Sequence, residues 1–210
     1  GTFQKRLANC EVVLKACRSS PLRMRLDGVT AGGLCEGKKE IVLLFLWKLM
    51  KKHLCICLGE LRMQATLSSP KHDRKSSATL IAEFDESSMV GWANQIIADA
   101  LQRLGLPPYA VEELDVEKKL VMMSFEDAHL KDGLYFLSLI WAIEPRCVDW
   151  THMIKAKTDG DRFANAQYVT TVSQKLGATM FITPRDIVFL RKNKLIVFLG
   201  SLLAMTASEE

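Results

Sequence analysis

This sequence predicts an all-helical (all-α) fold, and three observations point to it. Apolar residues recur at steps of three and four along most of the chain, which is the period of a helix with one buried face. No segment alternates apolar and polar residues long enough to make a convincing strand. The 210 residues, 49% of them hydrophobic, suffice for one large domain or one and a half small ones.

Two helices are expected in the first third of the chain. Residues 7–18 carry an apolar stripe, and Pro21 prevents the helix from continuing. A glycine-containing loop leads to a second helix over residues 38–52, which is apolar around its middle and basic at both ends. Residues 63–84 are then largely polar and lack a period, so we expect a flexible linker.

The central helix of the second part is expected within residues 130–145. Gly133 and Leu134 open it and Pro145 closes it. Because very little of its circumference is left for water, this helix should lie inside a bundle. The segments expected to pack around it are an amphipathic helix over 89–104 with capping residues at 85–88, a short turn at 150–154, a helix over 161–176, a turn of helix that begins at 183–186 and a last helix over 191–205.

The six cysteines do not have the spacing of a disulfide framework, so we expect them to be reduced, as in an intracellular protein. A zinc site is the alternative, with His53, Cys55 and Cys57 as ligands and Cys35 as the fourth. The paired C-x-x-C spacing of such sites is absent, which makes zinc the weaker interpretation.

Charge is unevenly distributed along the chain. The net charge of +4 includes a balance of +7 in residues 1–62 and of −4 in residues 85–210. A basic surface that contacts a partner is therefore expected in the first third. Only this feature favours nucleic acid, and we expect no nucleic-acid partner. We also expect no membrane partner, since the longest uncharged stretch is too short to span a bilayer.

Two stretches of the sequence recur, which indicates a duplicated unit. Residues 9–13 match residues 165–169 at an offset of 156. Lys38 and the apolar run behind it match Lys192 and its run at an offset of 154. The second copy has two further helices upstream, and their counterparts in the first copy would stand before residue 1.

Several motifs of the sequence resemble the calponin homology domain. They are Leu130-Lys131-Asp132-Gly133 with Leu137, Ile140 and Pro145, then Asn165-Ala166 followed by Leu176-Gly177-Ala178, then Thr183-Pro184-Arg185-Asp186-Ile187-Val188. In detail they are most similar to the last such domain of the fimbrin, or plastin, family. The first third resembles the end of the preceding domain through Leu7-x-Asn9-Cys10, Glu36-Gly37 and Leu44-x-Leu46-Trp47-x-Leu49-Met50.

The sequence departs from the family pattern at two residues and in its linker. Gly33 stands where an acidic residue is usual, and Arg185 replaces an acidic residue. The linker between the two matching parts is long.

The resemblance implies a calponin homology helical bundle over residues 85–207. The C-terminal half of a second calponin homology domain would precede it over residues 1–62. Paired domains of this family form actin-binding units, and two units cross-link filaments into bundles. The chain is then expected to bind actin filaments in the cytoplasmic actin cytoskeleton, with no enzymatic activity and with no cofactor or metal ion.

The resemblance also implies which residues face the filament. In the family this surface includes the last helix of the first domain and the opening helix of the second, which correspond here to residues 38–52 and 89–104. The lysines would meet the acidic actin surface, or else they are solvated helix ends. The apolar candidates belong at least in part to the core. The candidate actin-binding residues are Lys38, Lys39, Lys48, Lys51, Lys52, Met89, Trp92 and Gln95.

Other site chemistry has weaker support. Residues 32–38 spell the phosphate-loop pattern G-x-x-x-x-G-K, yet Lys39 stands where the magnesium-binding Ser or Thr is required, and no apolar strand precedes the loop. Asp159-Gly160-Asp161 is too short for a calcium loop. The four histidines show no spacing typical of a metal site or a nucleophile, so catalysis is not expected.

Two functional hypotheses follow from these features. The first is a fragment of an actin cross-linker, which the pair of domains favours. The alternative is a scaffold module that binds another protein or microtubules, which the acidic balance of residues 85–210 favours. In either case half a domain exposes an apolar face, so residues 1–62 should pack on the second domain, swap, or self-associate.

Overall fold

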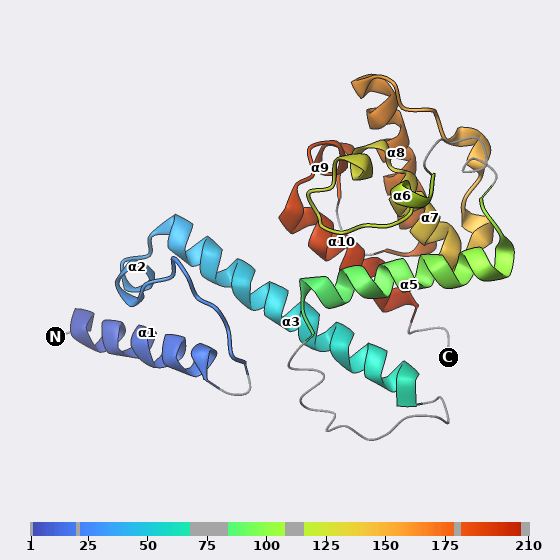
Figure 1. Cartoon of the computed structure of the whole chain (residues 1–210). Coiled ribbons are helices and arrows are strands. Elements are labelled where there is room, and N and C mark those ends of the chain that lie inside the picture. Colours follow the sequence, from blue (N-terminus) through green and yellow to red (C-terminus); the bar gives the residue numbers. More distant parts are fainter. Residues whose placement is uncertain (1, 20–21, 68–83, 108–115, 179–181, 207–210) are drawn as a thin grey trace. The chain divides into compact units, whose positions relative to one another are not determined.

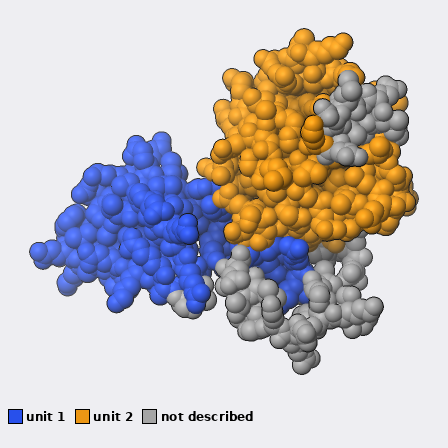
Figure 2. Space-filling model, in the orientation of Figure 1, with its two compact units in different colours: residues 1–84 blue, residues 85–210 orange. Residues whose placement is uncertain are grey.

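Helices form every regular element in the part of the chain that the structure describes, which confirms the all-helical fold (Figure 1). The structure, a computed structural model, describes residues 2–19, 22–67, 84–107, 116–178 and 182–206. The chain divides into unit 1, residues 1–84, and unit 2, residues 85–210, which Figure 2 shows in different colours. Each unit is described by itself.

Unit 1 contains the helices α1 (Thr2–Arg18), α2 (Ala31–Cys35) and α3 (Lys39–Leu67). Leu14 and Cys17 are the buried residues of α1, and they face the buried Met24, Leu26 and Val29 of the loop that follows. Partly buried apolar side chains of α2 and α3 complete this small core. They include Leu34, Ile41, Leu44, Phe45 and Leu49.

The helix α3 is longer than the sequence analysis predicted. It was expected to end at residue 52, but it continues to Leu67, so residues 63–67 are helical and do not belong to the linker. No proline interrupts residues 53–67, and Leu54, Leu58 and Leu61 keep the helical steps of four and three. The remainder of the predicted linker, up to residue 83, lies outside the described residues.

Unit 2 is a bundle organised around one buried helix, α7 (Leu134–Ile143), as expected. Every residue from Leu134 to Ala142 is buried. The helix α7 packs against α5 (Glu86–Leu104) and α8 (Asp159–Leu176). The other elements are α6 (Val116–Lys119), the 3-10 turns η2 (Ala128–Asp132), η3 (Pro145–Cys147) and η4 (Trp150–His152), α9 (Pro184–Val188) and α10 (Lys192–Met205).

Three helices of unit 2, α5, α8 and α9, begin at residues that are typical of a helix start. The Asp85 carboxylate accepts a hydrogen bond of 3.0 Å from the Ser88 amide at the start of α5, within the predicted capping segment. Thr158 caps α8, which therefore begins two residues before the predicted Asp161. Pro184 occupies the first turn of α9, where its missing N–H costs nothing.

A left-handed glycine separates the 3-10 turn η2 from the central helix. Gly133 has φ of 82°, a conformation that only glycine adopts without strain. The Asp132 carboxylate accepts a hydrogen bond of 2.9 Å from the Leu134 amide, which places negative charge at the start of α7. It also pairs with Lys119 at 3.2 Å.

Matching backbone hydrogen bonds show the duplication directly. The Lys38 amide donates to the Gly33 carbonyl at 2.9 Å, and 153 residues later the Arg191 amide donates to the Asp186 carbonyl at 2.8 Å. The helices α2 and α9 are both five residues long at the same offset. Lys39 therefore corresponds to Lys192, which corrects the sequence alignment by one residue.

Near the end of the first helix of each copy, one carbonyl accepts a backbone hydrogen bond from the loop that follows, seven residues later in the first copy and five residues later in the second. The Cys17 carbonyl accepts from the Met24 amide, and the Ser173 carbonyl accepts from the Ala178 amide, both at 2.9 Å. Cys17 and Ser173 are 156 residues apart, as are Asn9 and Asn165, so the predicted offset holds for this helix. The insertion between the two segments explains the change of offset from 156 to 153.

Candidate functional site

The first group of candidate residues lies at the turn between α2 and α3. Gly37, with φ of 71°, reverses the chain so that Lys38 and Lys39 lead into α3. The Lys38 ammonium pairs with the Glu36 carboxylate at 2.8 Å, and the hydrogen bond to Glu36 raises the pKa of Lys38. Both side chains are exposed, so this pair contributes little stability. Lys39 is exposed as well.

Further along α3, the candidate lysines differ in their surroundings. Lys48 donates a hydrogen bond of 3.0 Å to the Arg25 backbone carbonyl, which ties α3 to the loop of unit 1. Lys51 and Lys52 are half-buried and follow one turn later. The basic surface thus has two ends, and Lys48, which lies between them, is bonded to the Arg25 carbonyl.

An exposed apolar stripe runs along the same helix between the two groups of lysines. Leu43, Leu46 and Met50 are all large, hydrophobic and exposed. Their spacing of three and four residues puts them on one side of α3. Trp47 is half-buried. An open apolar face was expected in this unit from the sequence, without its residues being identified.

The second group of candidates lies on the opening helix of unit 2. Met89 is fully buried, since it belongs to the face of α5 that also buries Ala93, Ile97 and Ala100. The Met89 side chain therefore packs in the core beneath α5 and does not reach the surface of this helix. Trp92 is half-buried. Gln95 is exposed, and its amide donates to the Asp99 carboxylate at 2.7 Å. Trp92 and Gln95 are the two candidates of this helix that reach the surface.

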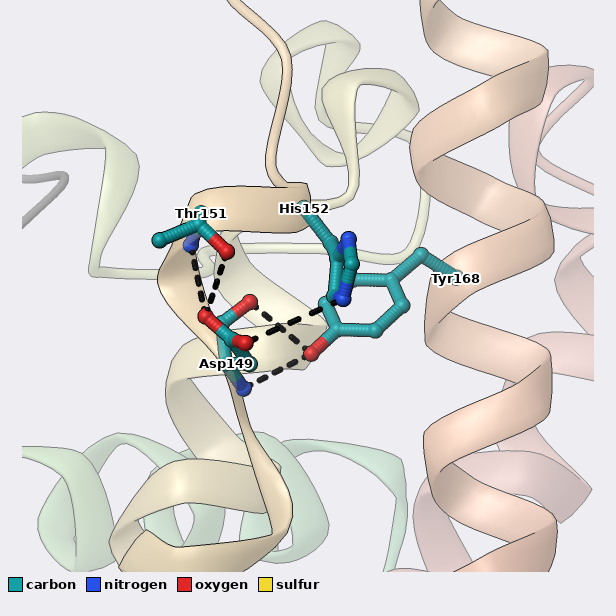
Figure 3. Close-up of polar contacts among 4 residues, drawn as sticks. All are labelled: Asp149, Thr151, His152 and Tyr168. Atoms are coloured by element: carbon teal, nitrogen blue, oxygen red, sulfur yellow. Dashed lines mark hydrogen bonds and ion pairs between the residues drawn. The ribbon is translucent and has the colours of Figure 1, made fainter.

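A polar cluster that the sequence analysis did not find joins η4 to α8 (Figure 3). The Tyr168 hydroxyl accepts a hydrogen bond of 2.7 Å from the Asp149 amide and lies 2.9 Å from the Asp149 carbonyl, to which it donates. The His152 ring packs edge-on against the Tyr168 ring at 5.4 Å between centroids. The residues are 16 to 19 positions apart, and their spacing matches no known motif, so no sequence signal could have found them.

The electrostatics of this cluster favour a structural role. Hydrogen bonds from the Thr151 hydroxyl and amide, at 2.7 and 3.0 Å, lower the pKa of Asp149. Partial burial raises the pKa of Tyr168. The ionised Asp149 carboxylate holds the start of η4 through Thr151, and the protonated Tyr168 phenol bonds the Asp149 backbone. Together these contacts form a clasp that fixes η4 to α8.

The alternative metal and nucleotide sites gain no support from the geometry. His53 and Cys57 lie one turn apart on α3, with 3.6 Å between the sulfur and Nε2. Among the described residues, however, no three side chains of metal-binding type converge. The residues described before the phosphate-loop pattern, 22–31, contain no strand. None of the six cysteines forms a disulfide. Within the described ranges no helix has both the length and the apolar character needed to cross a membrane.

Comparison with known sequences identifies a protein family that matches this chain. The calponin homology (CH) domain matches residues 86–208. Fimbrin-3 of Arabidopsis thaliana is 28% identical over 206 residues, which cover 98% of this chain and 24% of that protein. Fimbrin of Schizosaccharomyces pombe is 26% identical over 86% of the chain, and human plastin-3 is 23% identical over 90%. The chain spans about a quarter of the length of these curated relatives.

A solved structure resembles the chain over both units. It is the crystal structure of the actin-crosslinking core of Schizosaccharomyces pombe fimbrin, with a TM-score of 0.62 and 24% sequence identity. The match covers 94% of this chain and 34% of that one. At this identity the likeness establishes the fold alone.

Proposed function

The chain belongs to the calponin homology domain family, within its fimbrin/plastin group, and on this premise we propose that it binds actin filaments. The proposal depends mainly on how much of this chain is similar to fimbrins. Similarity to fimbrins runs along 98% of the chain, through both units, and the solved structure that matches both is named an actin-crosslinking core. This family acts by binding, so no catalytic role is assigned.

The basic surface of unit 1 supplies the electrostatic part of the proposed contact. Lys38 and Lys39 at the start of α3, and Lys51 and Lys52 between three and four turns later, carry positive charge toward an acidic filament. Lys48 has a smaller proposed role, because its ammonium is bonded to the Arg25 carbonyl. Contacts of this kind raise the association rate and are weakened by salt.

The opening helix of unit 2 supplies the second proposed contact. Trp92 offers a large, partly exposed ring, and Gln95 offers an exposed amide one turn away. Tryptophan is enriched among the residues that dominate binding energy at interfaces. Met89 takes part only by supporting the helix from the core, since it is fully buried.

The proposed cellular role is to contribute one filament-contacting region to a cross-linker that bundles actin in the cytoskeleton. The chain spans about a quarter of its relatives, so bundling would require a second filament-contacting region from the same or another molecule.

Co-sedimentation with actin filaments tests the proposal. The chain should pellet with filaments at low ionic strength and less at moderate ionic strength, because surface charges are screened within about 10 Å at 0.1 M salt. Co-sedimentation with microtubules is measured in parallel, to test the scaffold alternative. If the folded chain pellets with microtubules and not with actin, the scaffold alternative is correct and the actin proposal fails.

A further inference from the structure

The turn between α9 and α10 in unit 2 repeats the turn between α2 and α3 in unit 1 (Figure 1). At the offset of 153, Gly37 corresponds to Leu190, and both residues have a positive φ, of 71° and 48°. Each amide donates to a carbonyl three residues earlier, to Leu34 at 3.1 Å and to Ile187 at 3.0 Å. The backbone of the turn is therefore shared, and its side chains can be compared between the units.

The side chains of the two turns differ in charge. In unit 1 the residue before the left-handed position is Glu36, whose carboxylate pairs with Lys38 at 2.8 Å. Its counterpart in unit 2 is Phe189, which is 56% exposed. Among the residues of unit 2 that the structure describes, Phe189 is the only exposed aromatic side chain. Unit 2 therefore lacks the acid that neutralises this turn in unit 1, and an apolar ring takes its place.

Contacts on two sides hold the exposed Phe189 ring in position. The guanidinium carbon of Arg185 lies 5.8 Å from the ring centroid, which is within the range of a cation–π contact. The Phe163 ring of α8 packs edge-on against it, with 6.0 Å between centroids. Leu190, the next residue, has a left-handed backbone conformation that is strained for a residue with a Cβ atom. A fixed, exposed ring beside a strained residue is typical of a binding site.

Positive charge without a matching acid accompanies this ring. The cations of the segment include Arg185, Arg191 and Lys194, which are all exposed. Arg191 pairs at 3.4 Å with Asp186, whose side chain is only 5% exposed. Within the described ranges, no carboxylate lies at ion-pair distance from Arg185 or Lys194. Three exposed cations thus share one buried carboxylate, and the excess charge is available to an anionic ligand.

Acidic residues next to this segment limit the size of the ligand. Lys192 pairs with Glu86 at 3.3 Å and with Glu126 at 3.9 Å, so carboxylates lie directly beside the cations. Residues 85–210 as a whole have a balance of −4. A long polyanion, such as a nucleic acid or a membrane of anionic lipids, would meet these carboxylates and be repelled. A short ligand that covers only the ring and the three cations would not.

We propose that this corner of unit 2 binds a short acidic peptide of a partner protein, with one large apolar side chain next to its carboxylates. The apolar side chain packs on the exposed part of Phe189. The carboxylates pair with Arg185 and Lys194, and the planar guanidinium of Arg185 suits a bidentate contact. The turn of unit 1 rejects such a peptide, because Glu36 repels it and replaces the ring. The corner consists of Phe163, Arg185, Phe189, Arg191 and Lys194.

The probes are synthetic peptides in which glutamates flank a single leucine, phenylalanine or tryptophan. They are titrated into the complete chain labelled with nitrogen-15, and amide chemical shifts are followed by NMR. We expect the amides of residues 185–194 to shift in a saturable way, and salt to weaken the binding. A matched peptide with alanine at the apolar position should bind at least about tenfold more weakly, and so should one with glutamine in place of glutamate.

Matched substitutions show whether the peptide binds at this corner. Phe189→Ser and Arg185→Gln should each weaken binding at least about tenfold. Arg185→Lys should have an intermediate effect, because it keeps the charge but loses the planar guanidinium. Ile154→Ser and Arg146→Gln make the same changes at exposed positions of unit 2 outside the corner and should leave binding unchanged. Because Arg185 is exposed, its variants keep the fold even if Phe189→Ser lowers stability.

Three results would overturn the inference. The first is a titration in which none of the peptides shifts the amides of residues 185–194. The second is peptide binding that Arg185→Gln and Phe189→Ser leave unchanged. The third is a shift of the same amides by single-stranded RNA, or by vesicles that contain anionic lipid, at lower concentrations than the peptides require, because the ligand is then a polyanion. None of these samples contains actin, so the inference and the proposed function fail separately.

Discussion

The side-chain amide of Asn165 donates a hydrogen bond of 2.9 Å to the backbone carbonyl of Asp132. The same side chain also accepts from the Ile154 amide at 2.9 Å and donates to the Ile154 carbonyl at 2.8 Å. One fully buried residue therefore joins α8 to the turn before α7 and to the segment before α8. Buried polar groups of this kind fix one arrangement of the chain, because each would be costly to leave without a partner.

Asn165→Ala should destabilise unit 2 by about 3 kcal/mol, since it removes three part-buried hydrogen bonds to the backbone, each worth about 1 kcal/mol. Asn9→Ala at the equivalent, exposed position of unit 1 should change stability by less than about 0.5 kcal/mol. Chemical denaturation of both variants measures the difference. An equal loss of stability in Asn165→Ala and Asn9→Ala would contradict the different burial of the two asparagines.

Gly33 occupies the place of the capping carboxylate of Asp186, and the space for a side chain is already filled. A Cβ atom at Gly33 would collide with Cδ1 of Ile41. Gly33→Asp should therefore destabilise unit 1 by about 2 kcal/mol, as overpacked sites do. Ile41→Ala in the same molecule should recover part of that loss. A double-mutant cycle checks this, and additive effects would show that the two side chains do not share the space.

Acid should weaken the start of α9. The Asp186 carboxylate accepts from the Thr183 hydroxyl at 2.7 Å and from its amide at 2.9 Å. Burial opposes ionisation, but these hydrogen bonds and the nearby Arg191 outweigh it and lower the pKa of Asp186 below its ordinary 3.8. Since the folded pKa is lowered, the stabilisation is present above pH 3.8 and is lost as pH falls through the folded value.

Thr183→Ala should accordingly cost about 1 kcal/mol at pH 7 and progressively less below about pH 4. Thermal unfolding of the variant and the parent across this range measures the difference. A cost that stays constant down to pH 2 would mean that the Asp186 carboxylate is not the partner of this hydroxyl.

The clasp between η4 and α8 should depend on the phenol oxygen of Tyr168. Tyr168→Phe keeps the ring against His152 but removes both hydrogen bonds to Asp149. Because the cluster is partly exposed, water replaces one partner, and we expect a loss of about 1 kcal/mol, or roughly 4 °C in Tm. His152→Ala should have a smaller effect, since it leaves the hydrogen bonds in place. Differential scanning calorimetry tests this order, and a larger effect of His152→Ala would contradict it.

The elements that were predicted from the sequence are those whose signals are local. Pro145 closes α7, Asp85 caps α5 and Pro184 opens α9, and each acts through its own backbone or its immediate neighbours. The buried character of α7 could also be read from its composition, because apolar residues surround the whole helix.

What could not be predicted depends on contacts between distant residues or on signals that compete. The pairing of Tyr168 with Asp149 spans 19 residues and follows no motif. Met89 was expected to lie in the core only in part, and it is fully buried, because periodicity alone does not say how far a face turns inward. The lysines at 51 and 52 resembled a helix end, yet α3 continues because no breaking residue follows them. The two lysines therefore indicated a helix end at residue 52, where α3 does not end.

Charge reversal on the basic surface tests the central claim, actin binding, most directly. Lys51→Glu with Lys52→Glu is compared with Lys157→Glu with Lys175→Glu, which makes the same charge change at exposed positions of unit 2. If the proposal is correct, co-sedimentation of folded protein with actin filaments will show at least about tenfold weaker binding for the first pair, which corresponds to about 1.4 kcal/mol, and little change for the second. Equal binding by the two double variants would contradict the claim that this surface contacts the filament.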